Sequence, residues 1–213
     1  MNHEMKSAPQ RLLVLVGAGG HGRVVAQCAL AAGWRCVFCD PGRGVGELID
    51  GVEVVANLES EAVASFPDAA FIVTVGANAV RRRIVEQLTE AGAVFASVID
   101  PSSIVSRTAS VAPGAAVMGR AVVNAGARIG AHAIVNTAAV VEHDCVIEEG
   151  AQISPGAVLT GGVGVGAWAE IGAQATVLPG RSICALARIG AGAVVTRDVT
   201  EPGVHVGAPA RAR

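Results

Sequence analysis

Apolar and polar positions follow two different periods along the chain. Between residue 11 and about residue 95, apolar runs alternate with amphipathic segments and glycine-containing turns. Three runs read as buried strands, at 12–16, 35–40 and 69–75, while 20–32 and 79–91 have the apolar spacing of helices. Strands that alternate with helices predict a small parallel sheet of the doubly wound α/β type.

Beyond residue 100 the apolar period becomes six residues. Every sixth residue from Val105 to Val195 is Val, Ile or Leu, and the residue two places before each of them is nearly always Ala. This pattern is the hexapeptide repeat of a parallel β-helix, in which branched side chains point inward and small residues fit the corners. Three hexapeptides form one triangular coil, so residues eighteen positions apart stack, and the run suffices for roughly five coils.

The junction between the two patterns lies near Pro101, in VIDPSS. We therefore expect an N-terminal α/β domain over residues 1–100 and a β-helix domain with a C-terminal tail over residues 101–213. The composition agrees, because aromatic residues make up only 3% of the chain and Tyr is absent. A core built from Val, Ile and Ala instead is typical of narrow, repetitive solenoids.

Charge and hydropathy exclude several classes of protein. The net charge of -2 and the isoelectric point near 6.2 give no basis for nucleic-acid binding. The charge-free stretch from Ala151 to Ala169 is rich in glycine and reads as turns and short strands, not as a segment inserted in a membrane. The N-terminal MNHEMKSAPQ lacks the apolar segment of a secretion signal, so we expect a cytoplasmic protein.

Cys36 and Cys39 form the one C-x-x-C pair of the sequence. A metal or redox site is poorly supported, because there is no second pair and a spacing of three along a strand directs the thiols to opposite faces. We expect buried, inert thiols and no bound metal.

The glycine loop GAGGHG, residues 17–22, lies between a predicted strand and a predicted helix. Gly17, Gly19 and Gly22 satisfy G-x-G-x-x-G, and Asp40 ends the next strand, where a ribose-binding acid is expected. Backbone N–H groups at a helix N-terminus bind diphosphates, which dinucleotides and nucleotide sugars both carry. A tight structural turn is a third interpretation. The domain is too short for a complete dinucleotide fold, and the β-helix half offers no hydride chemistry, so a nicotinamide enzyme is the weakest reading.

His143 is the candidate for acid–base chemistry in the β-helix half. It lies between Glu142 and Asp144 in VVEHDC, and a histidine beside a carboxylate has the composition of a general base. On the eighteen-residue lattice its neighbours are Gly161 above and Ala125 below, which leave room for a ligand. The alternative is a solvent-facing histidine at the edge of a solenoid.

The remaining histidines and Cys145 are weaker candidates. His3 lies in the N-terminal segment, His205 lies in the C-terminal tail, and His132 occupies an outward position without an acidic neighbour. Cys145 could carry an acyl group as a nucleophile. It occupies the small corner position of its repeat, so we interpret it as structural.

Three segments together resemble one known family. The segment NTAAVVEHDCVIEEGAQISPGAVLTGGVGVG, the loop GAGGHG and the C-terminal GVHVGAPAR are similar to the sialic acid O-acetyltransferase NeuD family, which includes PglD-type acetyltransferases of UDP-4-amino sugars and perosamine N-acetyltransferases. The resemblance covers nearly the whole chain. It implies a Rossmann-like N-terminal domain, a left-handed parallel β-helix, a homotrimer, acetyl-CoA as co-substrate, and a place in surface glycan biosynthesis.

The resemblance also implies roles for four residues of the β-helix. His143 matches the base that takes a proton from the attacking amine or hydroxyl, and Asp144 matches the acid that orients it. Gly161 matches a glycine whose N–H lies near the thioester oxygen. Gln152 departs from the pattern, because many relatives carry there a second histidine that contacts the acetyl group. Gln can still donate a hydrogen bond, but not as a cation.

In the N-terminal domain the resemblance implies a nucleotide-sugar site. Gly17, Gly19, Gly20 and Gly22 would cradle the diphosphate, with His21 and Arg23 beside it. Asp40 would meet the nucleoside, and Asn78 and Arg81 would line the other side of the crevice. The alternative for Arg81 is that it forms a solvated helix face together with Arg82 and Arg83. Arg188 and Arg211 are candidates for CoA phosphates, although solvated surface charge explains each of them as well.

Three functions follow, in decreasing order of support. The first is an acetyl-CoA-dependent acetyltransferase that acts on the amino group of a nucleotide-linked amino sugar. The second is an O-acetyltransferase of sialic acid or another sugar hydroxyl, which the diphosphate-binding loop disfavours. The third is a non-catalytic nucleotide-sugar-binding scaffold, supported only by Gln152.

Overall fold

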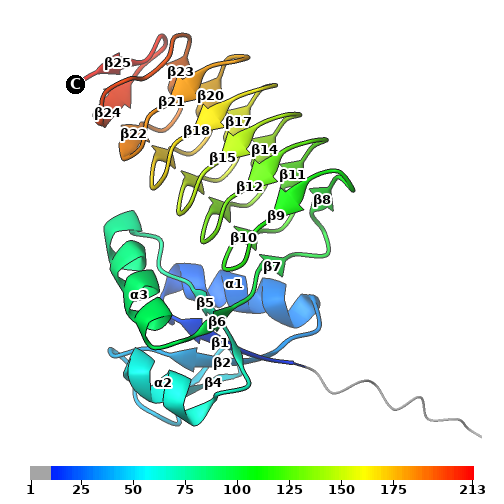
Figure 1. Cartoon of the computed structure of the whole chain (residues 1–213), viewed down its shortest axis with the longest axis vertical. Helices are drawn as coiled ribbons and strands as arrows, with labels where there is room; N and C mark the ends of the chain where they lie inside the picture. The colour runs from blue at the N-terminus through cyan, green and yellow to red at the C-terminus, as the bar shows by residue number, and fades with distance from the viewer. Residues whose placement is uncertain (1–10) are drawn as a thin grey trace, which may run out of the picture.

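The first half of the chain folds around one sheet with helices on both faces (Figure 1). The structure is a computed structural model and describes residues 11–213. The strand order is β3-β4-β2-β1-β5-β6, and all pairings are parallel except β3 with β4. The strands are β1 (Leu12–Val16), β2 (Arg35–Cys39), β3 (Leu48–Ile49), β4 (Val52–Ala56), β5 (Ala70–Val73) and β6 (Val94–Phe95), and the helices are α1 (Gly20–Ala31), α2 (Glu59–Ser65) and α3 (Asn78–Glu90).

β1 is apolar throughout because helices cover both of its faces. Leu13 and Leu15 pack in the layer that includes α1, while Val14 and Val16 pack in the layer that includes α2 and α3. Such two-sided burial is why central parallel strands read as continuous apolar runs. The two thiols of the C-x-x-C pair follow the same alternation, since Cys36 belongs to the first layer and Cys39 to the second.

The strand order places a topological switch point at the carboxyl end of the sheet, and we call the region between the loops there the crevice. The chain passes from β1 through α1 to β2 on one side, whereas β5 pairs with β1 on the other side. Ligands of open α/β sheets bind at such a switch point, outside the carboxyl ends of the strands. The loop after β1 and the loop after β5 therefore form the two walls of the crevice.

The second half is a left-handed parallel β-helix of three sheets. We call them the domain-side sheet, the second sheet and the third sheet, and the third has five strands, so five coils are complete. The domain-side sheet contains β7 (Val98–Ile99), β10 (Ala116–Val117), β13 (Ile134–Val135), β16 (Gln152–Ile153), β19 (Glu170–Ile171), β22 (Ala187–Ile189), β24 (Gly203–Val206) and β25 (Arg211–Ala212). The second contains β8 (Ile104–Val105), β11 (Val122–Val123), β14 (Val140–Val141), β17 (Val158–Leu159), β20 (Thr176–Val177) and β23 (Val194–Val195). The third contains β9 (Ser110–Val111), β12 (Arg128–Ile129), β15 (Val146–Ile147), β18 (Gly164–Val165) and β21 (Ser182–Ile183).

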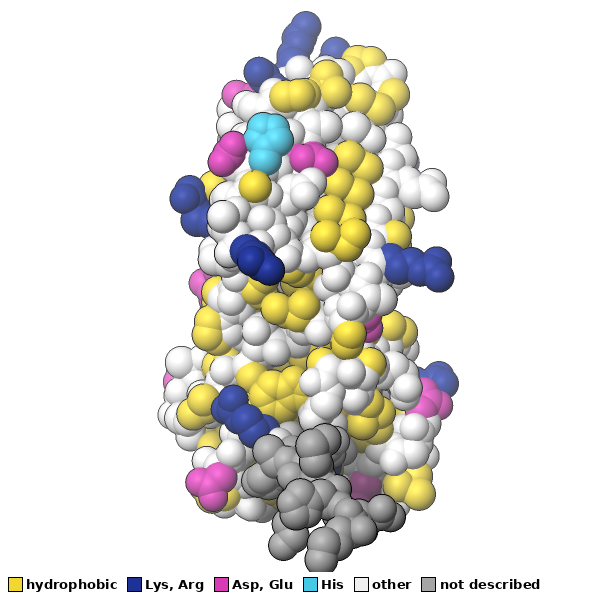
Figure 2. All heavy atoms as spheres, turned by 90° about the vertical axis from the view of Figure 1, so that its right-hand side faces the viewer, with side chains coloured by type: hydrophobic (Ala, Val, Ile, Leu, Met, Phe, Trp, Pro, Cys, Tyr) yellow, Lys and Arg dark blue, Asp and Glu magenta, His cyan; other side chains and the backbone are white. Residues whose placement is uncertain are grey.

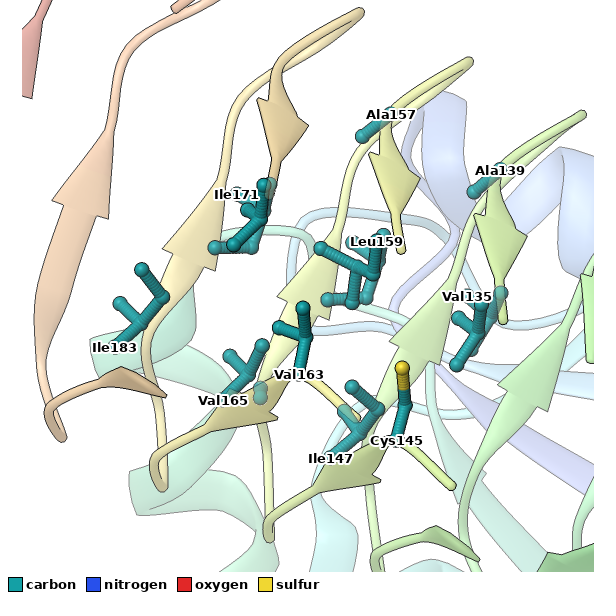
Figure 3. Packing of buried hydrophobic residues seen from close by; sticks show 14 of the residues in the cluster. Val135, Ala139, Cys145, Ile147, Ala157, Leu159, Val163, Val165, Ile171 and Ile183 are labelled. Carbon is teal, nitrogen blue, oxygen red and sulfur yellow. The ribbon is translucent and has the colours of Figure 1, made fainter. Parts of the chain in front are cut away.

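The hexapeptide lattice predicted the core of the β-helix correctly. Strands pair with an offset of eighteen residues, as Val141 with Leu159. Branched residues such as Ile147 and Val165 stack inside the coil, while alanines such as Ala139 and Ala157 fill the corners (Figure 3). β7 begins at Val98, on the N-terminal side of the expected boundary, and already pairs with β10.

The N-terminal domain packs on the domain-side sheet of the β-helix. Its α1 layer forms one continuous core with Val98, Ala116 and Ile134. His132 lies at this junction, with 7% of its surface exposed and its ring edge-on to Phe95 at a centroid distance of 4.6 Å. His132 therefore points outward from the coil, as expected, but the docked domain covers this corner and buries it. Within residues 11–213, no helix has the length and hydropathy needed to cross a bilayer.

Candidate active site

His143 lies at the corner where β14 turns into β15. Its imidazole is exposed, and its Nδ1 is 2.9 Å from the Oδ2 of Asp144. A proton on Nδ1, shared with this carboxylate, leaves the lone pair of Nε2 free to accept another proton. The hydrogen bond to Asp144 raises the pKa of His143 above its ordinary value, and the charges of Asp144 and Glu142 add to the effect.

Gly161 lies directly against the imidazole, as the eighteen-residue lattice predicted. A Cβ at this position would come within 2.4 Å of Nε2 and 2.6 Å of Cε1 of His143. Only glycine therefore lets the ring lie there. The N–H of Gly161 takes part in no hydrogen bond formed among residues 11–213.

The glycine loop forms one wall of the crevice in the N-terminal domain. Gly17 has a φ of 110°, and a Cβ at Gly22 would lie 1.9 Å from the carbonyl oxygen of Gly17, so the tight turn requires both glycines. α1 begins at Gly20, and no side chain caps it. The N–H groups of its first turn can therefore bind an anion.

Asp40 and His21 border the same loop. The carboxylate of Asp40 accepts hydrogen bonds from the N–H of Ala18 at 2.6 Å and of Gly42 at 2.8 Å, which joins the loops after β1 and β2. Burial, together with the positive charge of Arg81, lowers the pKa of His21 to about 4. His21 is therefore neutral near pH 7 and would meet a phosphate as a hydrogen-bond donor rather than as a cation.

Comparison with known proteins identifies the family. A model described as the PglD N-terminal domain matches residues 12–88. The acetyltransferase domain of PglB from Neisseria gonorrhoeae FA1090, solved with acetyl coenzyme A, is 35% identical over 96% of this chain and 100% of that one, with a TM-score of 0.89. PerB, a perosamine N-acetyltransferase from Caulobacter crescentus solved with CoA and GDP-perosamine, is 33% identical over 97% and 98%, with a TM-score of 0.89. This chain belongs to the family of PglD-like nucleotide-sugar acetyltransferases.

The family resemblance seen in the sequence is thereby confirmed, and the protein is an acyltransferase. WeeI from Acinetobacter baumannii AYE, at 21% identity and a TM-score of 0.67, shares the fold.

Gln152 lies on a different side of this acetyltransferase from His143. It is the outward residue of β16 in the domain-side sheet, between Ile134 and Glu170 in the strand register. Its Oε1 is buried without a hydrogen-bond partner among the described residues. His143 lies at the corner between the second and third sheets, which in a triangular prism is the corner opposite the domain-side sheet. One chain therefore holds His143 apart from both Gln152 and the crevice.

Arg23 and Arg81 are already engaged within the acetyltransferase. The guanidinium of Arg23 makes a two-pronged ion pair with Asp50, at 2.7 and 3.0 Å, on the surface of the β3–β4 turn. Arg81 is buried, with 1% of its surface exposed, so a solvated helix face describes only Arg82 and Arg83. Arg81 makes four hydrogen bonds within the protein, and Asn78 is one of the acceptors.

A cavity of about 450 Å³ lies where the start of α3 faces the β-helix. Asn78 and Arg82 line it from the domain, and Trp168 and Glu170 line it from the β-helix. Sequence reasoning missed Trp168 and Glu170, because only the docking of the domain brings them opposite α3. His143 is not among the lining residues.

The other candidates take the following places. Arg188 lines the same cavity, and its Nε donates a hydrogen bond to Oε2 of Glu170 at 3.3 Å. Arg211 lies in β25 and is exposed at the C-terminal end. The ring of His205 bonds the carbonyl oxygen of Glu201 at 3.1 Å, and His3 lies outside the described residues. Among residues 11–213, no three His, Cys, Asp or Glu side chains come together as a metal site would require.

Proposed function

We propose that this acetyltransferase transfers the acetyl group of acetyl-CoA to the amino group of a nucleotide-linked amino sugar, with His143 as general base. The contact between His143 and Gly161 carries the proposal, because it places Nε2 against the backbone of a glycine whose N–H bonds no described residue. A base and an oxyanion donor in one place are the two groups that acyl transfer to an amine needs. The relatives bound to acetyl-CoA, or to CoA with GDP-perosamine, support the same chemistry.

The reaction proceeds by direct attack. The neutral amine attacks the thioester carbonyl, the new C–N bond forms, and Nε2 of His143 takes a proton from the amine nitrogen. The negative charge on the carbonyl oxygen is stabilised by the N–H of Gly161. The C–S bond then breaks, and the imidazolium returns the proton to the departing CoA thiolate. Asp144 stabilises the imidazolium throughout.

Cys145 does not fit a covalent intermediate. It is fully buried, its Sγ lies 3.2 Å from the carbonyl oxygen of Thr160, and burial raises its pKa. A nucleophilic thiol needs the opposite, namely access and a lowered pKa. This supports direct attack.

The nucleotide of the acceptor would occupy the crevice at the switch point of the sheet. The first-turn N–H groups of α1 would bind the diphosphate between the loop 17–22 and the loop after β5, with His21 and Arg23 beside it and Asn78 opposite. For Arg23 to reach a phosphate, it must leave or share Asp50. The nucleoside would lie near Asp40, whose two carboxylate oxygens each retain a free lone pair.

The complete site would form between copies of the chain in a homotrimer. His143 of one copy would face the crevice and Gln152 of the next, because one chain holds these groups on opposite sides. Five of the six outward residues of the second sheet are also apolar, namely Ile104, Val122, Val140, Val158 and Val194, and the sixth is Thr176. Ile104 is 65% exposed. A space-filling view shows apolar side chains on the surface of the β-helix (Figure 2). Exposed apolar rows of this kind mark association surfaces.

The proposed function is tested by CoA release. The purified protein is incubated with acetyl-CoA and a panel of UDP-, GDP- and dTDP-linked amino sugars, and the free thiol is measured. We expect release with at least one amino sugar, and none with the matched sugar that carries a hydroxyl in place of the amine. If CoA is released only with the hydroxyl sugar, or only with free sialic acid, the enzyme is an O-acetyltransferase and not an N-acetyltransferase. In this proposal the acetylated nucleotide sugar would serve as a precursor of surface glycans. A cytoplasmic location stays a prediction.

A further inference from the structure

Arg81 uses nearly all its hydrogen-bonding capacity to join two parts of the protein. Its Nη1 donates to the carbonyl oxygens of Val75 at 2.9 Å and Gly76 at 3.1 Å. Its Nη2 donates to Oδ1 of Asn78 at 2.7 Å and to the carbonyl oxygen of Gly150 at 2.6 Å. Three of these acceptors belong to the domain and the fourth belongs to the β-helix. Since a guanidinium has five N–H groups, only the one on Nε has no partner among the described residues.

The β-helix side of this contact is a shaped corner. Gly150 and Trp168 are eighteen residues apart, and both have the left-handed corner conformation, with φ of 62° and 58°. A Cβ at Gly150 would lie 2.2 Å from the Trp168 ring, so the indole lies flat on the glycine. The guanidinium of Arg81 lies 5.5 Å from the centre of that ring, at cation–π distance. Asn78 adds a hydrogen bond from Nδ2 to the carbonyl oxygen of Trp168 at 2.8 Å.

The domain side of the contact belongs to the crevice. Val75 and Gly76 form the loop after β5, which is the wall opposite the glycine loop. Thr74 ties this wall to the glycine loop, because its N–H donates to the carbonyl oxygen of Val16 and its hydroxyl donates to that of Gly17 at 2.7 Å. A chain of direct bonds therefore leads from the glycine loop through Thr74, the β5 loop and Arg81 to the corner of the β-helix.

We propose that Arg81 is a positioning residue that fixes the orientation of the nucleotide-binding crevice on the β-helix. The proposal rests on the proposed function. In the proposed trimer the β-helix would carry the surfaces that meet the next copy, so the angle of the crevice on it would decide where the sugar amine lies relative to His143. Domains joined by one connection are mobile unless the interface holds them. A misplacement of about 1 Å lowers the rate of such a reaction by about 100-fold.

Lysine cannot replace this arginine. The four acceptors surround a planar fork, whereas an ammonium has three donors on a flexible stem. The test therefore compares Arg81→Lys with Trp168→Leu, which removes the ring on the β-helix side without changing any residue of the domain. Arg83→Met is the matched control, because Arg83 is exposed on the same helix. Each variant is measured for kcat, KM for acetyl-CoA and calorimetric affinity for UDP and GDP, and hydrogen exchange is followed at 75–79, 96–97 and 148–152.

We expect Arg81→Lys and Trp168→Leu to lower kcat by about 10- to 100-fold while nucleotide affinity and KM for acetyl-CoA stay unchanged. Exchange should accelerate at the connection 96–97 and on both sides of the contact, and Arg83→Met should behave as the wild type. The proposal would be overturned if the Arg81→Lys variant had the same kcat and the same hydrogen-exchange rates as the wild type. Loss of nucleotide binding with unchanged exchange would overturn it too, and would make Arg81 a ligand contact. If the wild type itself proves inactive, the proposed function fails, while the exchange data still decide the positioning role.

Discussion

The imidazole of His143 lies against the backbone of Gly161, so closely that a Cβ on Gly161 would be only 2.4 Å from Nε2. The two residues are eighteen positions apart, one full coil of the β-helix. This relationship puts an exposed imidazole and the backbone of a glycine together at one corner of the β-helix.

Replacing His143 should abolish most of the activity. We expect His143→Ala to lower kcat by about 100-fold or more, which is the usual contribution of a general base. CoA release measures the rate, and circular dichroism with calorimetric nucleotide binding checks that fold and crevice are intact. A variant with a near-normal rate would show that another group removes the proton.

Activity should fall in acid as His143 becomes protonated. Because Asp144 raises the pKa of His143, the acidic limb of the kcat/KM profile should lie above pH 6.5, the ordinary value for histidine. Asp144→Asn removes the carboxylate that favours the imidazolium, so the limb should move to lower pH while the plateau rate decreases. The measurement is the pH–rate profile of both proteins. An identical limb in the variant would mean that Asp144 does not control this histidine.

Gly161→Ala should inactivate the enzyme without unfolding it. The new methyl group would collide with the imidazole and push it out of position. The control is Gly164→Ala, three residues further on, where a Cβ meets no atom within 4 Å. We expect a large loss of kcat for the first variant and little change for the second, with similar melting temperatures. If the two variants were equally active, Gly161 would have no role in the reaction.

Two inactive variants should complement each other. If each site combines His143 of one copy with the crevice of the next, trimers mixed from His143→Ala and Asp40→Ala chains contain some sites with both parts intact. Random mixing of equal amounts would restore about a quarter of the sites. Co-refolding followed by CoA-release assays measures this, and light scattering establishes the trimer. No recovery in confirmed mixed trimers would place the whole site within one chain.

Acid should weaken the fold through His132. Burial lowers its pKa to about 4, with Arg81 contributing, so the folded protein resists a proton that the unfolded chain accepts near pH 6.5. Stability should therefore fall as the pH drops from 6.5 towards 4, by up to about 3 kcal/mol for this one group. His132→Asn, which tolerates the left-handed φ of 58°, should flatten the dependence of melting temperature on pH. His205→Asn is the control, and an equal effect of both variants would contradict the assignment.

The sequence alone determined the β-helix and the neighbours of His143. A hexapeptide repeat is nearly one-dimensional, so a residue's position modulo eighteen fixes its strand, its face and its stacking partner. The contact with Gly161 and the corner position of Cys145 follow from counting. The buried strands of the first domain and its glycine loop were readable because apolar runs and glycines carry local signals. The β3–β4 hairpin and α2 were not predicted. The elements between residues 48 and 65 are short, and their apolar and polar residues are mixed.

Only the tertiary structure decided what lies between the two halves. From the sequence, Arg81 was either a crevice residue or part of a solvated helix face, and His132 was an outward residue of the repeat. No local pattern shows that a domain will dock on the corner that contains Gly150 and Trp168. That docking depends on the shapes of two surfaces far apart in sequence, so it converts one arginine into a buried link and one histidine into a core residue. The separation of His143 from the crevice likewise emerges only in three dimensions, because the face that the domain covers is set by packing and not by the repeat.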